Sequence, residues 1–249
     1  MKRLTEFLLG LGLCLQTNSL SLRISLKLEL QKKKKKSLNL KMTLNDRNIL
    51  EPSTCRHEIR CDGTTIETIV TNEENIVEQW VSSVYVGKQR VVGLDTEWMN
   101  VQKASTKKAT MKVAILQLCV EDKCLIVQLF CMNNMPSSLQ SFLMDSSFEF
   151  VGVGVMNDID MLKKNYGLDC NTGTDLVKFA KKKWPEKITS GSLKYLAKEL
   201  VGLEMEKSKA VVTSDWKAKE LNEAQVQYAC IDAYASFKIG KMVLSDEHS

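Results

Sequence analysis

The 249-residue sequence predicts an α/β fold in which helices cover both faces of a mixed β-sheet. Three observations predict this class. Apolar, strand-like runs fill the first half of the chain, strand and helix patterns alternate in its middle, and the last third is helical. The chain also holds only 12 Gly and 3 Pro, which favours long regular elements with few loops.

The first expected elements are a hairpin and a helix. Strands over 57–61 and 64–70 flank Asp62-Gly63, a dipeptide typical of a tight hairpin turn. A helix is expected over 73–86, because acidic residues open it and Ile76, Trp80, Ser83 and Val84 share one face. Gly87 then ends the helix.

The remaining elements follow from apolar runs and their breakers. Further strands are expected over 90–94, 113–120, 125–129 and 149–155. Further helices are expected over 138–144, 159–166, 176–183, 192–200 and 222–243. The tripeptide 121–123 predicts a tight connection between two of these strands, and Gly167 predicts the end of a helix.

We expect residues 1–53 to be a basic tail, disordered or targeting, in front of one domain over 54–249. Residues 1–41 hold 10 Lys and Arg against 2 Asp and Glu. The run Lys32–Lys36 is typical of a solvated segment or a nuclear-import patch, whereas scarce acids and scattered Ser also suit an organelle transit peptide. The expected location is therefore the nucleus, with an organelle as the alternative. The apolar stretch 7–15 is too short to span a membrane.

Composition excludes several classes of enzyme and metal site. The 2 His lie outside the apolar core segments, which excludes Ser-His-Asp and Cys-His nucleophiles. The 8 Cys contain no C-x-x-C pair, so zinc-finger and thioredoxin-like sites are also excluded. Residues 91–249 hold 20 basic and 20 acidic side chains, so bulk charge gives no argument for nucleic-acid binding.

Two acids stand at the end of the strand in the segment VVGLDTEW. Asp95 and Glu97 are two residues apart, so in a strand they point to the same face. Two adjacent carboxylates repel each other, and a divalent cation between them removes that penalty. Their hard oxygen ligands suit Mg²⁺ or Mn²⁺. The alternative is that the strand ends at the surface and both acids are solvated.

Two further acids, Asp158 and Asp232, lie within or directly after apolar segments. Asp158 follows an apolar strand at the start of a helix, where it could be a metal ligand or simply a cap. Tyr228 and Asp232 are four residues apart on the last helix and share a face. Their structural interpretation is a hydrogen bond that fixes the helix.

Together these residues predict a site for phosphodiester hydrolysis. Asp95, Glu97, Asp158 and Asp232 would hold two Mg²⁺ or Mn²⁺ ions, which activate a water and clamp the scissile phosphate. Tyr228 would orient the water, because a phenol is a poor base at neutral pH.

At these residues the sequence resembles the DEDD superfamily of 3′–5′ exonucleases, in its tyrosine subgroup, and particularly the Werner-like exonucleases of the plant stand-alone type. The similarity covers about residues 54–245. It is carried by the segments VVGLDTEW (91–98), VAILQLCV (113–120), VGVGVMNDIDMLKKNYGL (151–168), SLKYLAKELVG (192–202) and SDWKAKELNEAQVQYACIDAYASFKI (214–239). The resemblance implies a ribonuclease H-like fold, with 54–249 as the exonuclease domain.

The resemblance also assigns residues to roles. Asp95, Glu97, Asp158 and Asp232 match the metal-binding acids, and Tyr228 matches the motif tyrosine. The histidine subgroup carries His where this chain has Gln227. Thr96 and Trp98 are candidates for contact with the 3′-terminal nucleotide, although Trp98 could equally be a core residue at the rim. Asn222 replaces the usual Thr before the last helix, and both residues cap helices.

Four lysines follow the first motif. Lys103, Lys107, Lys108 and Lys112 lie where no acid intervenes between Glu97 and Glu121, so they are a candidate phosphate track. The alternative is solvated surface.

The expected function is therefore hydrolysis of 3′ DNA ends to nucleoside monophosphates. The alternatives are an RNA-processing exonuclease similar to ribonuclease D, or an inactive nucleic-acid-binding scaffold. A helicase or DNA-repair protein would act in trans, and no membrane partner is expected.

Overall fold

The computed structural model describes residues 53–102, 109–206 and 208–245. They belong to the unit Leu50–Ser249, so the predicted basic tail and its targeting signals lie outside the described residues. The described strands are β1 (Thr54–Cys61), β2 (Thr64–Thr71), β3 (Val91–Gln102), β4 (Ala109–Val120), β5 (Lys123–Val127), β6 (Glu149–Gly152) and β7 (Thr174–Asp175).

The helices alternate with the later strands and then close the chain. They are α3 (Glu74–Val86), the 3₁₀ turn η1 (Leu129–Cys131), α4 (Ser137–Met144), α5 (Val155–Tyr166), α6 (Leu176–Lys183), α7 (Leu193–Val201), α8 (Lys209–Val212) and α9 (Glu223–Ser245). None of the helices in the described ranges is long and apolar enough to cross a membrane.

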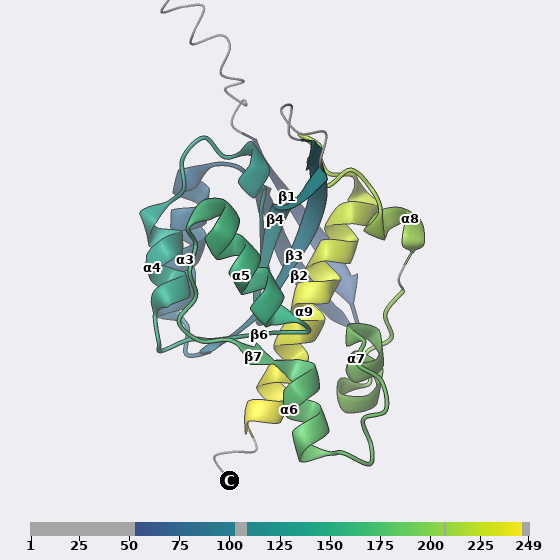
Figure 1. Ribbon diagram of the computed structural model, residues 1–249. Coiled ribbons are helices and arrows are strands. Elements are labelled where there is room, and N and C mark those ends of the chain that lie inside the picture. Colours follow the sequence, from purple (N-terminus) through teal and green to yellow (C-terminus); the bar gives the residue numbers. More distant parts are fainter. Residues whose placement is uncertain (1–52, 103–108, 207, 246–249) are drawn as a thin grey trace, which may run out of the picture. The chain divides into compact units, whose positions relative to one another are not determined.

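The described strands form one mixed seven-stranded sheet in the order β1-β2-β5-β4-β3-β6-β7. The pairs β1–β2, β3–β4 and β4–β5 are antiparallel, whereas β2–β5, β3–β6 and β6–β7 are parallel. Helices α3, α4 and α5 pack on one face around one apolar core, and α6, α7 and α9 pack on the other around a second (Figure 1). The predicted mixed sheet with helices on both faces is confirmed.

The predicted hairpins owe their turns to left-handed residues. Asp62 and Gly63 have φ values of 51° and 72°, the pairing that a two-residue hairpin turn requires. Between β4 and β5 the connection is Glu121-Asp122, with φ 55° at Glu121. It is one residue shorter than predicted, because Lys123 already pairs with Val120.

Two details of the predicted helices are wrong. The buried face of α3 is formed by Val77, Trp80, Val81 and Val84, an i, i+3, i+4, i+7 stripe. This stripe buries more apolar surface than the predicted face, which included Ile76 and Ser83. Strand β6 ends at Gly152 and α5 begins at Val155, not at residue 159, because Gly154 adopts φ 73° and turns the chain. Asp158 therefore lies in the first turn of α5.

The long helix α9 lies directly against β3 and β4 because small residues let it approach. A Cβ atom on Gly93 of β3 would lie 2.0 Å from the carbonyl oxygen of Ala233 and 2.7 Å from the backbone nitrogen of Phe237. Only glycine permits that separation. This close contact fixes where the polar face of α9 meets the sheet.

Candidate active site

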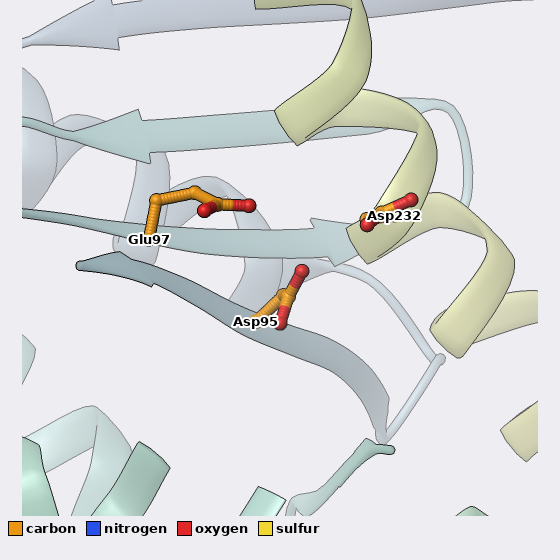
Figure 2. A group of neighbouring side chains, drawn as sticks. All are labelled: Asp95, Glu97 and Asp232. Carbon is orange, nitrogen blue, oxygen red and sulfur yellow. The ribbon is translucent and has the colours of Figure 1, made fainter. Parts of the chain in front are cut away.

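Three of the four predicted acids come together where β3 passes under α9. Asp95, Glu97 and Asp232 each offer a carboxylate oxygen, and these oxygens lie within 4.8 Å of one another (Figure 2). Asp95 and Glu97 reach the same side because they alternate with Thr96 along the strand. Asp232 is only 3 % exposed, so its charge is held largely out of water.

The acids line a cleft of about 210 Å³. Tyr228, Asp232 and Ser236 enter it from one face of α9, since they are spaced four residues apart. The cleft is completed by Val153 and Leu193. Ser236, Val153 and Leu193 were not predicted. The spacing from Asp232 could have indicated Ser236, whereas two apolar residues in separate segments carry no sequence signal.

A hydrogen-bonded cap fixes the start of α9. The backbone N–H of Gln225 donates to Asn222 Oδ1 at 3.0 Å, and the N–H of Asn222 donates to Gln225 Oε1 at 3.0 Å. Gln225 Nε2 also donates to Ser214 Oγ at 3.0 Å. Asn222 thus caps the helix as predicted.

Tyr228 is held in place by the segment before α9. Its ring lies 6.0 Å from that of the buried Trp216, centroid to centroid. Burial, the three neighbouring carboxylates and a hydrogen bond to Asp232 raise the pKa of Tyr228 well above its ordinary value. The hydroxyl therefore stays protonated at neutral pH, where it can donate a hydrogen bond but cannot act as a base.

The fourth acid belongs to a separate hydrogen-bonded chain. Trp98 Nε1 donates to Thr96 Oγ1 at 2.6 Å, and Thr96 Oγ1 donates to Asp158 Oδ1 at 2.5 Å. Asp158 is not part of the group of three carboxylates within 4.8 Å. It is joined to that group through Thr96, the residue between Asp95 and Glu97. The expected convergence of four acids is thus seen for three of them.

Burial of Asp158 should make the stability of the protein depend on pH. Desolvation raises the pKa of Asp158 to about 6 from 3.8, against the smaller lowering by hydrogen bonds from Thr96 and Trp98. Folding therefore favours the neutral form of Asp158. The resulting contribution to the free energy of unfolding is fully present below pH 3.8 and is lost as the pH rises through 6. Asp158→Asn should stabilise the metal-free protein at pH 8 by up to about 3 kcal/mol.

Thermal melts in chelator at pH 8 and pH 5 check this expectation. The gain of Asp158→Asn over the unmodified protein should shrink at pH 5, because the native carboxyl is then largely neutral. Asp160→Asn is the matched control, since Asp160 is exposed on the same helix. An equal gain at both pH values would show that the buried charge is not the cause.

The predicted lysines are placed only in part. Lys103, Lys107 and Lys108 lie outside the described residues. The ammonium of Lys112 lies 4.8 Å from the ring centroid of Tyr166 and 5.4 Å from that of Phe130. A cation between two rings gains cation–π attraction, which is a structural role sufficient to explain its position.

The donor set fits a divalent cation. Three carboxylates so close together repel one another when ionised, and burial of Asp232 strengthens that repulsion. A hard cation would relieve it with the oxygen ligands that Mg²⁺ and Mn²⁺ prefer. Asp95, Glu97 and Asp232 are the residues that would hold it.

Comparison with known proteins agrees with this chemistry. A family model described as 3′–5′ exonuclease matches residues 68–244. The chain belongs to the 3′–5′ exonuclease family. All five predicted catalytic residues of this family member fall inside the match, and the resemblance seen in the sequence is confirmed.

Two relatives and one solved structure illustrate the family. The chain is 33% identical over 161 residues to a 3′–5′ exonuclease of Arabidopsis thaliana, covering 61% of this chain and 52% of that one. It is 32% identical over 150 residues to the bifunctional 3′–5′ exonuclease/ATP-dependent helicase WRN of Mus musculus, covering 60% of this chain and 10% of that one. The chain thus spans about half or less of these relatives.

The structural match concerns the fold. Escherichia coli RNase D, an exoribonuclease involved in structured RNA processing, superposes with a TM-score of 0.60 at 17% identity. The match covers 72% of this chain and 44% of RNase D. The ribonuclease H-like architecture expected from the sequence is confirmed.

Proposed function

We propose that the chain is a divalent-metal-dependent 3′–5′ exonuclease that releases nucleoside monophosphates from the 3′ ends of DNA. The observation that carries this proposal is the convergence of Asp95, Glu97 and Asp232 with Tyr228 in one cleft. These side chains come from a strand and a helix more than 130 residues apart in the chain, so their meeting is a property of the fold.

The residues have complementary roles in hydrolysis. Asp95, Glu97 and Asp232 would hold one ion, and Asp158 would contribute to a second. When bound, two Mg²⁺ or Mn²⁺ ions supply the positive charge that acidifies the attacking water and stabilises the leaving oxygen. While its O–H donates to Asp232, the Tyr228 oxygen accepts a hydrogen bond from the attacking water and so orients it. Attack on phosphorus breaks the P–O3′ bond, leaving a mononucleotide and a new 3′-hydroxyl.

Thr96 and Trp98 are proposed to contact the terminal nucleotide, with Lys103, Lys107, Lys108 and Lys112 along the phosphates. The indole N–H of Trp98 is already engaged with Thr96, so its free contribution is the face of the ring. Stacking on that face suits the base of any nucleotide. This arrangement supports binding without sequence preference.

RNA is the second candidate substrate. The observation that favours it is the shared fold with RNase D, which is named an exoribonuclease. DNA is favoured by the resemblance to Werner-like exonucleases, since the chain is 32% identical over 150 residues to WRN of Mus musculus. A helicase or DNA-repair partner in trans is also proposed, because the mouse relative's name joins an exonuclease to a helicase.

A nuclear location is proposed from the basic run Lys32–Lys36.

A substrate panel tests the proposal. Purified protein is incubated with 5′-labelled DNA and RNA of one sequence, single-stranded or with a recessed 3′ end, in Mg²⁺, Mn²⁺ or chelator. A ladder that shortens from the 3′ end of DNA, faster than of RNA and absent in chelator, is the expected result. Faster shortening of RNA would reverse the substrate order, and no ladder with any polymer would contradict nuclease activity.

A further inference from the structure

Gln117 lies in the middle of the sheet beside the proposed metal site. It is the register partner of Asp95 on β3 and of Ile126 on β5. Its side chain has no exposed surface. Residues directly opposite each other on neighbouring strands share a face, with Cβ atoms about 5 Å apart. The Gln117 amide is therefore within side-chain reach of the Asp95 carboxylate.

The alternation of β4 confirms which face Gln117 occupies. Ile115 and Cys119 belong to the apolar core under α9, whereas Leu116 and Leu118 belong to the core on the other face. Gln117, between them in the alternation, points toward α9. Across the sheet its row runs from Val70 through Ile126 to Gln117 and Asp95, so one amide separates an apolar row from an acid.

Both polar atoms of this amide lack a hydrogen-bond partner among the described residues. Burying an amide without hydrogen-bond partners is unfavourable, so such groups call for an explanation. Other buried glutamines in the described chain are satisfied. Gln128 Nε2 donates to the carbonyls of Ala218 and Lys219 at 3.0 and 3.2 Å.

We propose that Gln117 is a positioning residue for Asp95. In the metal-loaded protein its Nε2 donates to the Asp95 carboxylate, directly or through one bound water, and so fixes the oxygen that faces the metal. This inference rests on the proposed function. Partners of this kind orient metal-binding side chains and raise their affinity. A neutral amide suits the role, because Lys or Arg at this position would compete with the cation for the carboxylate.

Gln117→Met tests the proposal, because Met has a similar length and no amide. Two effects of opposite sign are expected. In chelator the variant should melt at the same or a higher temperature, since the unpaired amide is gone. Its affinity for Mn²⁺, measured by calorimetric titration of the intact protein, should fall about tenfold or more. The kcat should fall while the KM for oligonucleotide stays unchanged.

Gln128→Met is the matched control. It removes a buried glutamine whose hydrogen bonds are made to the backbone, so the metal-free protein should melt at a lower temperature while Mn²⁺ affinity is unchanged. A general loss of stability therefore gives a pattern different from the loss of a positioning group.

Each other outcome overturns the inference. If Gln117→Met binds Mn²⁺ as the unmodified protein does, Gln117 positions nothing, and the proposed function survives as long as the unmodified protein cleaves. If the unmodified protein neither binds Mn²⁺ nor cleaves, both proposals fail. Should Gln117→Met not fold, Gln117→Leu replaces it. Failure of both to fold would show that the amide is needed by the metal-free structure.

Discussion

Asp232→Asn is expected to lower kcat/KM for hydrolysis of an oligonucleotide from its 3′ end by at least about a thousandfold. This corresponds to about 4 kcal/mol of transition-state stabilisation. The amide keeps the shape of the side chain but loses its charge and one ligand oxygen. Asp232 is the member of the three-acid group that α9 supplies, so its replacement leaves only the two acids of β3. Steady-state hydrolysis of an oligonucleotide in Mg²⁺ measures the effect.

The same variant should not lose stability. Removing one of three mutually repelling carboxylates should raise the melting temperature of the metal-free protein, so inactivity could not be attributed to unfolding. Asp160→Asn, on the exposed side of α5, is the control and should retain full activity. Activity of Asp232→Asn within tenfold of the unmodified protein would show that the three-acid group is not the catalytic centre.

Gly93→Ala is expected to be the most destabilising single methyl addition in the described chain, with a loss above about 3 kcal/mol in the free energy of unfolding. The new Cβ would meet two backbone atoms of α9, at Ala233 and Phe237, and neither can rotate away. Helix α9 must then move off the sheet. Because Asp232 lies next to Ala233, activity should fall with stability.

Urea denaturation measures this loss. Gly191→Ala provides the control, because the nearest atom to its Cβ is a side-chain methyl of Val177 at 3.4 Å, an ordinary contact. That variant should unfold within about 0.5 kcal/mol of the unmodified protein. An unchanged urea midpoint for Gly93→Ala would mean that α9 does not depend on the close contact.

The parts of the fold with a strong local signal could be predicted from the sequence. Apolar runs and turn residues predicted the sheet, the hairpins and the helices of the second half. The outer ends of β3 and β4 could not be predicted, because exposed polar residues such as Asn100 and Thr110 interrupt their apolar pattern. There the two strands pair only with each other. The short elements β7 and α8 lack enough residues to show a period.

Within the site, spacing alone predicted which acids share a face. Asp95 with Glu97, and Tyr228 with Asp232, follow from the periods of strand and helix. Contacts between distant segments could not be predicted. The hydrogen bond from Thr96 to Asp158 joins residues 62 positions apart, and the two rings around Lys112 come from η1 and α5. The missing partner of Gln117 becomes visible only once burial and register are known.

Strand β3 serves both layers of the molecule at once. It sends Asp95 and Glu97 toward α9, and Thr96 toward Asp158 on α5. An engineer who redesigned the packing of either layer would therefore disturb the chemistry, whichever layer was chosen. Altered substrate preference is better sought at two apolar residues that border the cleft and are not acids of the site. These are Val153, between β6 and α5, and Leu193, the first residue of α7.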